Sequence, residues 1–174
     1  LDELLIIYND IVNGIPPDLP STASYFSYIA HQQKILASKQ EISRLEAYWR
    51  KAHDNHSARL SLPGDLKQGS SKSIVGKSVK MLLAREYYDA VKKLANTEGI
   101  TMNTVFLAAY QLLLHFWTGQ KVITTGTPMS CRNNEEFART VGYFANLVPI
   151  SIEFPADFTG VKLFREVYQK ILGA

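Results

Sequence analysis

The apolar positions of the first sixty residues recur at helical spacing and predict three helices. The first covers 1–12, the second runs from a cap at Ser21 or Thr22 to about Ser38, and the third covers about 39–51. The third helix carries one apolar stripe opposite its charged residues. The members of this stripe are Ile42, Leu45, Trp49 and Ala52.

A polar stretch rich in glycine, proline and serine follows, over about 53–73. It is long for a connection inside a compact domain, so we expect a lobe boundary here. After it, alternation predicts a strand over 74–83, and helical spacing predicts an amphipathic helix over 84–97 that Gly99 stops. Thr101 is expected to cap the next helix, which is apolar nearly all round and therefore expected to be fully buried.

The last third of the chain has the pattern of two strands and a helix. We expect a strand at Val122, a turn at 126–128, a second strand over about 146–154 and a helix over 158–172. This order of elements predicts an α/β or α+β fold in which helices pack on a mixed sheet.

Composition narrows the function classes. The chain is 46% hydrophobic and 20% charged with a net charge of +3, which is typical of an ordinary globular protein and leaves no basic cluster for nucleic acid. The longest apolar run, 105–117, is too short to span a bilayer. The single cysteine, Cys131, excludes an internal disulfide and fits a reducing, cytoplasmic compartment. We therefore expect neither a nucleic-acid nor a membrane partner.

Polar residues stand among apolar ones between Val122 and Ile152. Two β-branched runs flank a segment that contains Arg132 and Asn146. Burying such groups is costly unless they are paired or face a functional cleft. The stretch is therefore predicted to form one wall of an active site.

The histidines and the cysteine do not form an evident catalytic or metal site. His53 and His56 lie on either side of an aspartate but lack a third ligand, so no metal site is assigned. His115 is expected to be a satisfied core residue and His31 to pack at a helix surface. Cys131 has no nearby histidine in sequence, so it is not assigned as a catalytic thiol. No other segment supplies an evident nucleophile or base, and no catalytic residue is assigned to this chain.

Motifs spread along the chain resemble the condensation domain of nonribosomal peptide synthetases. The second half carries Leu-Leu-Leu-His at 112–115, Thr-Gly-Gln at 118–120, Gly-Thr-Pro at 126–128, Arg132 and Val-Gly-Tyr-Phe-Ala-Asn at 141–146. The family usually has Ile/Val-Gly-x-Phe-Val-Asn-Thr in the last motif. This chain keeps the glycine, phenylalanine and asparagine but departs at the valine and threonine positions, which are Ala145 and Leu147.

The first half agrees in the same order. Tyr-Phe-Ser-Tyr-Ile-Ala-His-Gln at 25–32 is similar to the family's Tyr-x-Asp-Tyr-Ala-Val-Trp-Gln, with departures at Ser27 and His31. Tyr-Trp at 48–49 and Leu-Ser-Leu-Pro-x-Asp at 60–65 match the continuation. The resemblance covers essentially the whole chain.

The resemblance implies part of a two-lobed fold like that of chloramphenicol acetyltransferase, with a substrate tunnel between the lobes. Residues 1–60 are then the end of an N-terminal lobe, 61–73 an inter-lobe linker and 74–174 the first part of a C-terminal lobe. The family's catalytic motif, His-His-x-x-x-Asp-Gly, would lie immediately before Leu1. Alone, this chain is therefore expected to be inactive and marginally stable.

The resemblance also assigns roles to four residues. Asn146, with Gly142 and Phe144, is expected to line the tunnel. Arg132 is expected to be a structural clamp that pairs with the aspartate of the catalytic motif. Without that partner, Arg132 should be unpaired or solvated.

The implied reaction is amide formation between a carrier-bound acyl or peptidyl donor and an aminoacyl acceptor. Substrates arrive on the phosphopantetheine of carrier domains beside an adenylation domain, and the domain binds no cofactor directly. Two alternatives stay open. One is a stand-alone acyltransferase of the same fold that uses coenzyme A or a carrier, and the other is a non-catalytic module that docks carrier domains.

Overall fold

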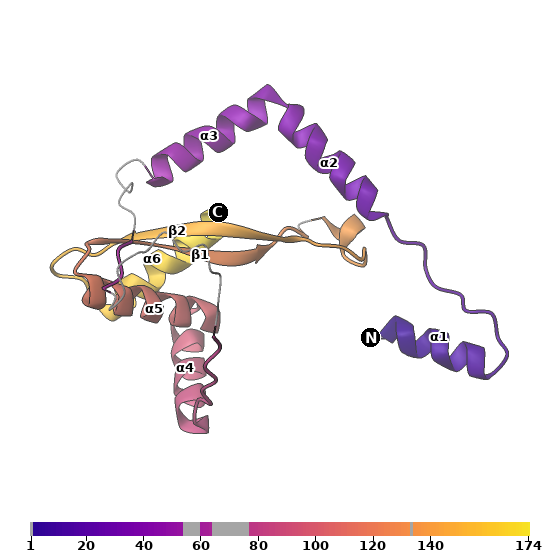
Figure 1. The fold of residues 1–174 in the computed structure, drawn as a ribbon, viewed down its shortest axis with the longest axis horizontal. Helices are drawn as coiled ribbons and strands as arrows, with labels where there is room; N and C mark the ends of the chain where they lie inside the picture. Colours follow the sequence, from indigo (N-terminus) through magenta and orange to yellow (C-terminus); the bar gives the residue numbers. More distant parts are fainter. Residues whose placement is uncertain (1, 54–59, 64–76, 133) are drawn as a thin grey trace. The chain divides into compact units, whose positions relative to one another are not determined.

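The computed structural model describes residues 2–53, 60–63, 77–132 and 134–174. Six α-helices, one 3₁₀ helix and two strands occur in this part of the chain (Figure 1). In order they are α1 Asp2–Val12, α2 Tyr25–Ala37, α3 Lys39–His53, α4 Arg85–Glu98, α5 Met102–Thr118, β1 Val122–Ser130, η1 Glu135–Phe137, β2 Ala145–Glu153 and α6 Gly160–Gly173. The chain divides into two compact units, Leu1–Glu46 with Ser130–Asn146 (unit 1) and Ala47–Met129 with Leu147–Ala174 (unit 2).

The three predicted N-terminal helices are confirmed, but the start of α2 was misplaced. Its cap is Ser24, whose hydroxyl accepts a hydrogen bond from the backbone N–H of Ser27 at 3.1 Å, not Ser21 or Thr22. A cap must be the last extended residue before the first helical turn, and Ser24 has that backbone conformation. The predicted linker at 61–73 lies mostly outside the described residues, and the lobe boundary stays a prediction.

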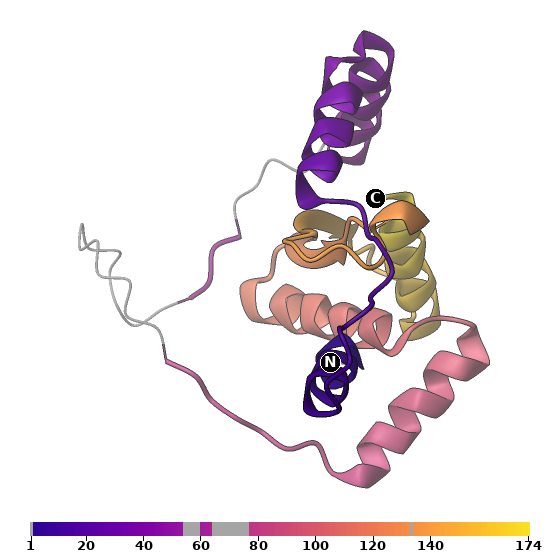
Figure 2. The same cartoon turned by 90° about the vertical axis from the view of Figure 1, so that its right-hand side faces the viewer.

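Unit 2 is built on one face of the β1–β2 ribbon, which α5 and α6 cover (Figure 2). The buried members of this core are Ala108, Leu114, Ile123, Ile152, Phe154, Leu163 and Val167. A second cluster of Ala95, Ile100 and Val105 joins α4 to α5. Alternate residues of β1 are buried against the helices, and in β2 Val148, Ile150 and Ile152 follow the same alternation. Ser151 of β2 is also buried, on the opposite face, where it bonds to His53.

The pairing of the two strands is antiparallel. The backbone N–H of Cys131 donates to the Phe144 carbonyl at 2.6 Å, and that of Phe154 donates to the Lys121 carbonyl at 2.7 Å. In this register the residues between these bonded pairs point their backbone groups alternately inward and outward. The predicted turn at 126–128 is wrong, because these residues lie inside β1.

Two prolines are tolerated in the ribbon because of this register. Pro128 in β1 and Pro149 in β2 both belong to the set whose backbone groups point to the outer edges. A proline there removes no hydrogen bond between the two strands. Proline was therefore a misleading sign of a turn in this segment.

The predicted strand over 74–83 is not present in its described part, 77–83. Residues 74–76 lie outside the described residues. Val79 and Leu82 are 95% and 99% exposed. A strand is held by ladder hydrogen bonds to a neighbour, and no described segment pairs with this one.

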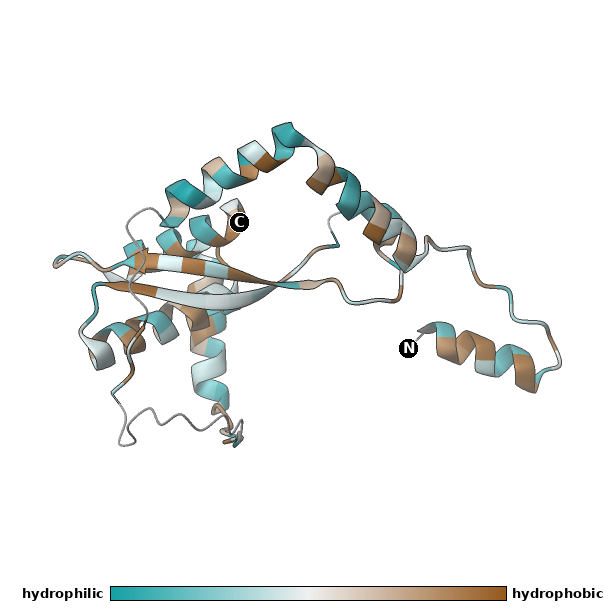
Figure 3. Cartoon of the chain, turned by 45° about the horizontal axis from the view of Figure 1, so that its top comes forward, coloured by the Kyte–Doolittle hydropathy of each residue, from teal (hydrophilic) through white to brown (hydrophobic). Residues whose placement is uncertain are grey.

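The prediction that the helix after Thr101 is fully buried is also wrong. One face of α5 is buried, with Thr104, Ala108, Gln111 and Leu114, but Tyr110 and other large apolar residues on the opposite side are exposed. Figure 3 shows hydrophobic and hydrophilic positions side by side along the helices and the ribbon. Only the positions of α5 that meet the ribbon, α6 and α4 are buried, so an apolar sequence on every side of the helix did not mean complete burial.

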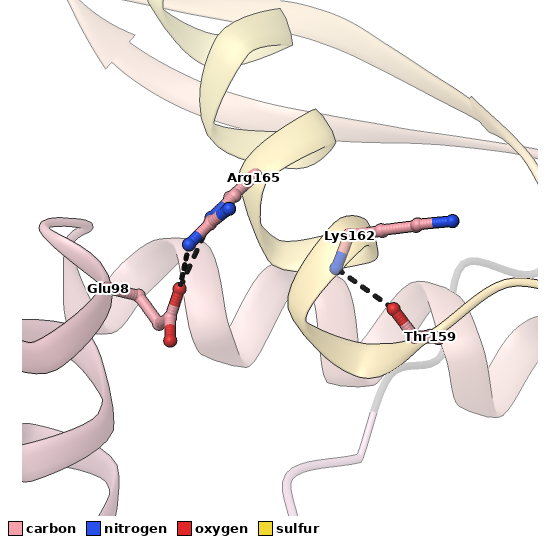
Figure 4. Close-up of polar contacts among 4 residues, drawn as sticks. All are labelled: Glu98, Thr159, Lys162 and Arg165. Atoms are coloured by element: carbon pink, nitrogen blue, oxygen red, sulfur yellow. Dashed lines mark hydrogen bonds and ion pairs between the residues drawn. The ribbon is translucent and has the colours of Figure 1, made fainter.

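The ends of α4, α5 and α6 have recognisable caps. Gly99 ends α4 in the left-handed conformation at φ 65°, and Thr101 caps α5 by accepting from the Thr104 N–H at 3.1 Å, both as predicted. Arg165 of α6 donates to Glu98 of α4 at 2.9 Å, next to the Thr159 cap of α6 (Figure 4).

In the described part of the chain no single helix is long and apolar enough to cross a membrane. Only α4 and α5 taken together pass that test of length and composition, and the pair is bent by 105°.

The Gly99 turn gives a direct test of the α4–α5 connection. Gly99→Ala is expected to lower the free energy of unfolding by roughly 1–2 kcal/mol, because a Cβ disfavours the left-handed conformation although the surrounding space is open. Gly160→Ala, in the first turn of α6 with ordinary φ, is the matched control and should not destabilise. Urea denaturation of the intact domain measures both, and equal effects of the two substitutions would contradict this account.

Candidate functional site

The sequence motifs of unit 1 meet in one aromatic cluster. Tyr28 of α2 lies 4.4 Å from Phe144 and 5.4 Å from Phe137, between ring centroids. Tyr25 contacts Phe144 edge to face at 5.4 Å. Phe137 and Phe144 are buried, so α2 and the segment between the two strands share this small core. His31 lies exposed beside Phe137, at a helix surface as predicted.

Arg132 organises the segment that joins β1 to β2. Its Nη1 donates to the carbonyls of Phe137 and Thr140, both at 2.7 Å, and to that of Ala138 at 3.4 Å. Its guanidinium carbon lies 3.9 Å from the centre of the Phe144 ring, a cation–π contact. The Phe137 carbonyl also accepts from the backbone N–H of Thr140 at 3.1 Å, and Arg132 adds a second donor there and supplies a donor to the Thr140 carbonyl.

The expectation that Arg132 is solvated is therefore wrong, while the expectation that it lacks an ion-pair partner stays a prediction. It forms no ion pair with any described carboxylate, but it is half-buried and bonded to three carbonyls. The sequence showed the arginine but not its partners, because every residue carries a carbonyl and only the backbone path selects three of them. Whether Arg132 also acts as a clamp for the catalytic motif stays a prediction.

Gly142 lies directly under the ring of Tyr25. A Cβ added at Gly142 would overlap the Tyr25 ring, so a glycine is needed at this position. The Tyr25 hydroxyl donates to the backbone carbonyl of Tyr143 at 2.9 Å, and the Thr140 hydroxyl donates to the carbonyl of Ala23 at 2.8 Å. The start of α2 thus holds residues 140–143 from one side. Tyr25 belongs to the motif at 25–32, and no role in the site was predicted for it.

Asn146 lies on β2, two residues after Phe144. Its side chain is exposed and has no hydrogen-bond partner among the described residues. A carboxamide has both a donor and an acceptor, so it can bind or orient a polar ligand. The structure therefore brings Arg132, Gly142 and Phe144 together in one turn and places Asn146 at the point where this turn enters the strand.

Cys131 and Tyr28 are neighbours in the same cluster. Burial, together with nearby Cys131 and Tyr25, raises the pKa of the Tyr28 phenol above its ordinary value. Tyr28 therefore stays neutral at physiological pH, which suits its packing against Phe144. The half-buried Cys131 is part of this packing.

The remaining histidines lie in unit 2, apart from His56, which is outside the described residues. His115 stacks on Phe154 at 4.4 Å and its Nδ1 bonds to the Gln120 carbonyl at 2.7 Å, as a satisfied core histidine should. His53 bonds through Nδ1 to the buried Ser151 at 3.1 Å. Within the described ranges no three acidic, histidine or cysteine side chains are grouped to hold a metal ion.

Known proteins match this chain over most or all of its length. The family model described as Condensation domain matches residues 1–174. The polyketide synthase PksN of Bacillus subtilis is 31% identical over 86% of this chain, and tyrocidine synthase 2 of Brevibacillus parabrevis is 31% identical over 90%. The match spans only 3% of the length of the first relative and 4% of the length of the second.

Solved structures agree on the fold. The first condensation domain of the CDA synthetase superposes with a TM-score of 0.80 at 19% identity, over 98% of this chain and 37% of that one. The X-domain from teicoplanin biosynthesis gives the same TM-score of 0.80 at 19% identity, over 97% of this chain and 39% of that one. The predicted fold class is thereby confirmed. The chain belongs to the condensation domain family.

Proposed function

We propose that this chain is part of a condensation domain that forms an amide bond between a carrier-bound acyl or peptidyl donor and an aminoacyl acceptor. The family match over the whole chain supports this proposal. The relatives compared above are named as a polyketide synthase and a tyrocidine synthase. The single observation that carries it is the Arg132-centred turn, which presents the Gly-x-Phe-x-Asn motif at the end of the ribbon where β1 connects to β2.

In this reaction the acceptor amine attacks the donor thioester, a C–N bond forms, and the C–S bond breaks with release of the carrier thiol. The reaction needs the amine oriented and the developing oxyanion stabilised. We assign Asn146 to orienting a substrate amide or thioester along the tunnel wall, with Gly142 and Phe144 shaping that wall. We assign no proton transfer to any residue of this chain.

Arg132 has donors left for a second role. All three of its carbonyl bonds use Nη1, and Nε and Nη2 form no hydrogen bond within the described residues. A guanidinium carries five N–H donors, so a carboxylate at the other edge does not compete with the carbonyls. The proposed pairing with the aspartate of the catalytic motif is therefore compatible with the observed turn.

The partners follow from the reaction. Donor and acceptor would be delivered as thioesters on the phosphopantetheine of carrier domains, and an adjoining adenylation domain would charge the acceptor carrier. The condensation domain itself would bind no cofactor. The synthetase would work in the cytoplasm, where the free thiol of Cys131 stays reduced.

Asn146→Ala in the intact synthetase tests the proposal. Amide formation is expected to fall about 10- to 100-fold, because loss of one oriented polar contact in a reacting complex has effects of this size. The amide product is measured by mass spectrometry against the amount of synthetase. Asn103→Ala, which removes an exposed carboxamide on α5, is the matched control and should keep full activity.

Unchanged amide formation in the Asn146→Ala synthetase would remove Asn146 from the site. A product that is an ester made from a soluble acyl donor would favour the stand-alone acyltransferase. Carrier binding without any product would favour the docking module.

A further inference from the structure

Tyr25, the first residue of α2, makes three contacts with the segment that carries the Gly-x-Phe-x-Asn motif. The hydroxyl of Tyr25 donates to the Tyr143 carbonyl at 2.9 Å. The Tyr25 ring covers Gly142 so closely that no Cβ fits, and it meets the Phe144 ring edge to face at 5.4 Å. All of these residues belong to unit 1.

These contacts fix the backbone just before Asn146. The hydrogen bond from the Tyr25 hydroxyl holds the carbonyl of Tyr143, and the Tyr25 ring packs against the Cα of Gly142. The edge-to-face contact with Tyr25 limits rotation of the Phe144 ring. Arg132 contacts the same Phe144 ring, with its guanidinium carbon 3.9 Å from the ring centre. Phe144 is thus held by both a cation and an aromatic edge, and Asn146 follows it by two residues along an extended chain.

We propose that Tyr25 is a positioning residue for the condensation reaction, which acts by fixing residues 142–144 and thereby the direction of the Asn146 side chain. This inference rests on the proposed function. Tyr25 touches no reacting group in this account. Its hydroxyl is one end of a single hydrogen bond, so removing the hydroxyl isolates its contribution while the ring and its packing remain.

The test uses the intact synthetase with Tyr25→Phe. Amide product per amount of synthetase is expected to fall about 3- to 30-fold, because a small displacement of an orienting group is costly to a reaction. In parallel, backbone hydrogen exchange of the purified synthetase is followed by mass spectrometry in peptides that cover 140–147. Exchange there is expected to rise about 2- to 10-fold, as loss of one hydrogen bond predicts.

Two further variants complete the experiment. Gly142→Ala pushes on the Tyr25 ring from below and should produce both changes more strongly. Tyr87→Phe removes a hydroxyl from an exposed tyrosine on α4 and should produce neither. If Gly142→Ala does not accumulate as folded protein, Tyr25→Phe alone decides the matter.

A fall in product without faster exchange at 140–147 would overturn the positioning role, and so would faster exchange with unchanged product. No change in either measurement would overturn it as well. Failure of the proposed function would be seen separately, as the absence of any amide product from the wild-type synthetase. The exchange measurement would still report whether Tyr25 holds the segment.

Discussion

Arg132→Ala is expected to lower the free energy of unfolding of the intact domain by about 2–4 kcal/mol and to abolish most amide formation. The substitution removes a charged donor from the carbonyls of Phe137 and Thr140 and a cation from the face of Phe144. Hydrogen bonds to charged groups contribute about 1.5–3 kcal/mol and a cation–π contact about 0.5–1 kcal/mol, so these losses together give the expected size. Urea denaturation measures the effect on stability.

Two controls separate this role from loss of charge. Arg85→Ala breaks an exposed i, i+4 ion pair with Asp89 and an exposed cation–π contact with Tyr88 at 5.5 Å, and should cost no more than about 1.5 kcal/mol. Arg132→Lys keeps the charge but cannot place a planar guanidinium against Phe144, so an intermediate loss is expected. A stability of Arg132→Ala within experimental error of the Arg85→Ala variant would refute the carbonyl-binding role.

Gln111→Glu is expected to destabilise unit 2 by more than about 3 kcal/mol at neutral pH. Gln111 is fully buried on α5, and its Nε2 donates to the Thr125 hydroxyl at 2.9 Å and to the Ile150 carbonyl at 3.0 Å. It therefore joins the helix to both strands of the ribbon. A carboxylate cannot donate either bond, and it would bring a buried charge against a carbonyl oxygen.

The pH dependence of Gln111→Glu identifies the cause. Burial raises the pKa of the introduced carboxyl in the folded state above its value in the unfolded chain. Its unfavourable effect is therefore smallest at low pH, where the carboxyl is protonated and can donate one bond. The effect grows as the pH rises above the unfolded-state pKa, and it is complete above the folded-state pKa. Urea denaturation at several pH values between about 5 and 8 should show this widening difference from the wild-type chain.

Gln111→Met is the matched control for this experiment. It keeps the length of the side chain, removes the donor to Thr125 and Ile150, and also removes Oε1, which has no partner in the described structure. A loss of about 1–2 kcal/mol is expected, with no dependence on pH beyond that of the wild type. If Gln111→Glu and Gln111→Met show the same pH profile, the buried-charge explanation is wrong.

Local signals in the sequence predicted the elements whose boundaries depend on neighbouring residues. Thr101 and Gly99 set helix ends through hydrogen bonds and backbone angles that involve only four or five consecutive residues. The strand at Val122 was predicted for the same reason, since its alternation reflects one covered face. The short helix η1 was not predicted, because three residues are too few to show a helical repeat of apolar positions.

The wrong predictions depended on partners distant in the sequence. The segment 77–83 alternates like a strand but has no neighbouring strand in the described chain, and α5 is apolar on a face that meets nothing there. Pro128 looked like a turn residue because its effect depends on which direction its missing N–H would point. That direction follows from pairing with β2, about twenty residues away, which no local pattern contains.

In the candidate site, too, the residues of one local motif were predicted and a residue distant in sequence was missed. The motif identified Arg132, Gly142, Phe144 and Asn146 as a group, and the structure places the first three in one turn. The contribution of Tyr25 was missed, because it lies more than a hundred residues away in sequence and its function there rests on a hydroxyl that meets a backbone carbonyl. The sequence nonetheless contained both halves of this contact. The motif at 25–32 has a large aromatic residue, Tyr25, and the motif at 141–146 has a glycine, Gly142, against which its ring can pack.

The outward-facing prolines of the ribbon have a consequence for association between chains. Each free edge of a sheet is a template onto which a foreign strand can add by hydrogen bonding. Pro128 interrupts the row of donors along one edge and Pro149 interrupts it along the other. Among the described residues neither outer edge is paired, and a strand from another molecule would lose one ladder bond on whichever edge it approached, which disfavours edge-to-edge addition.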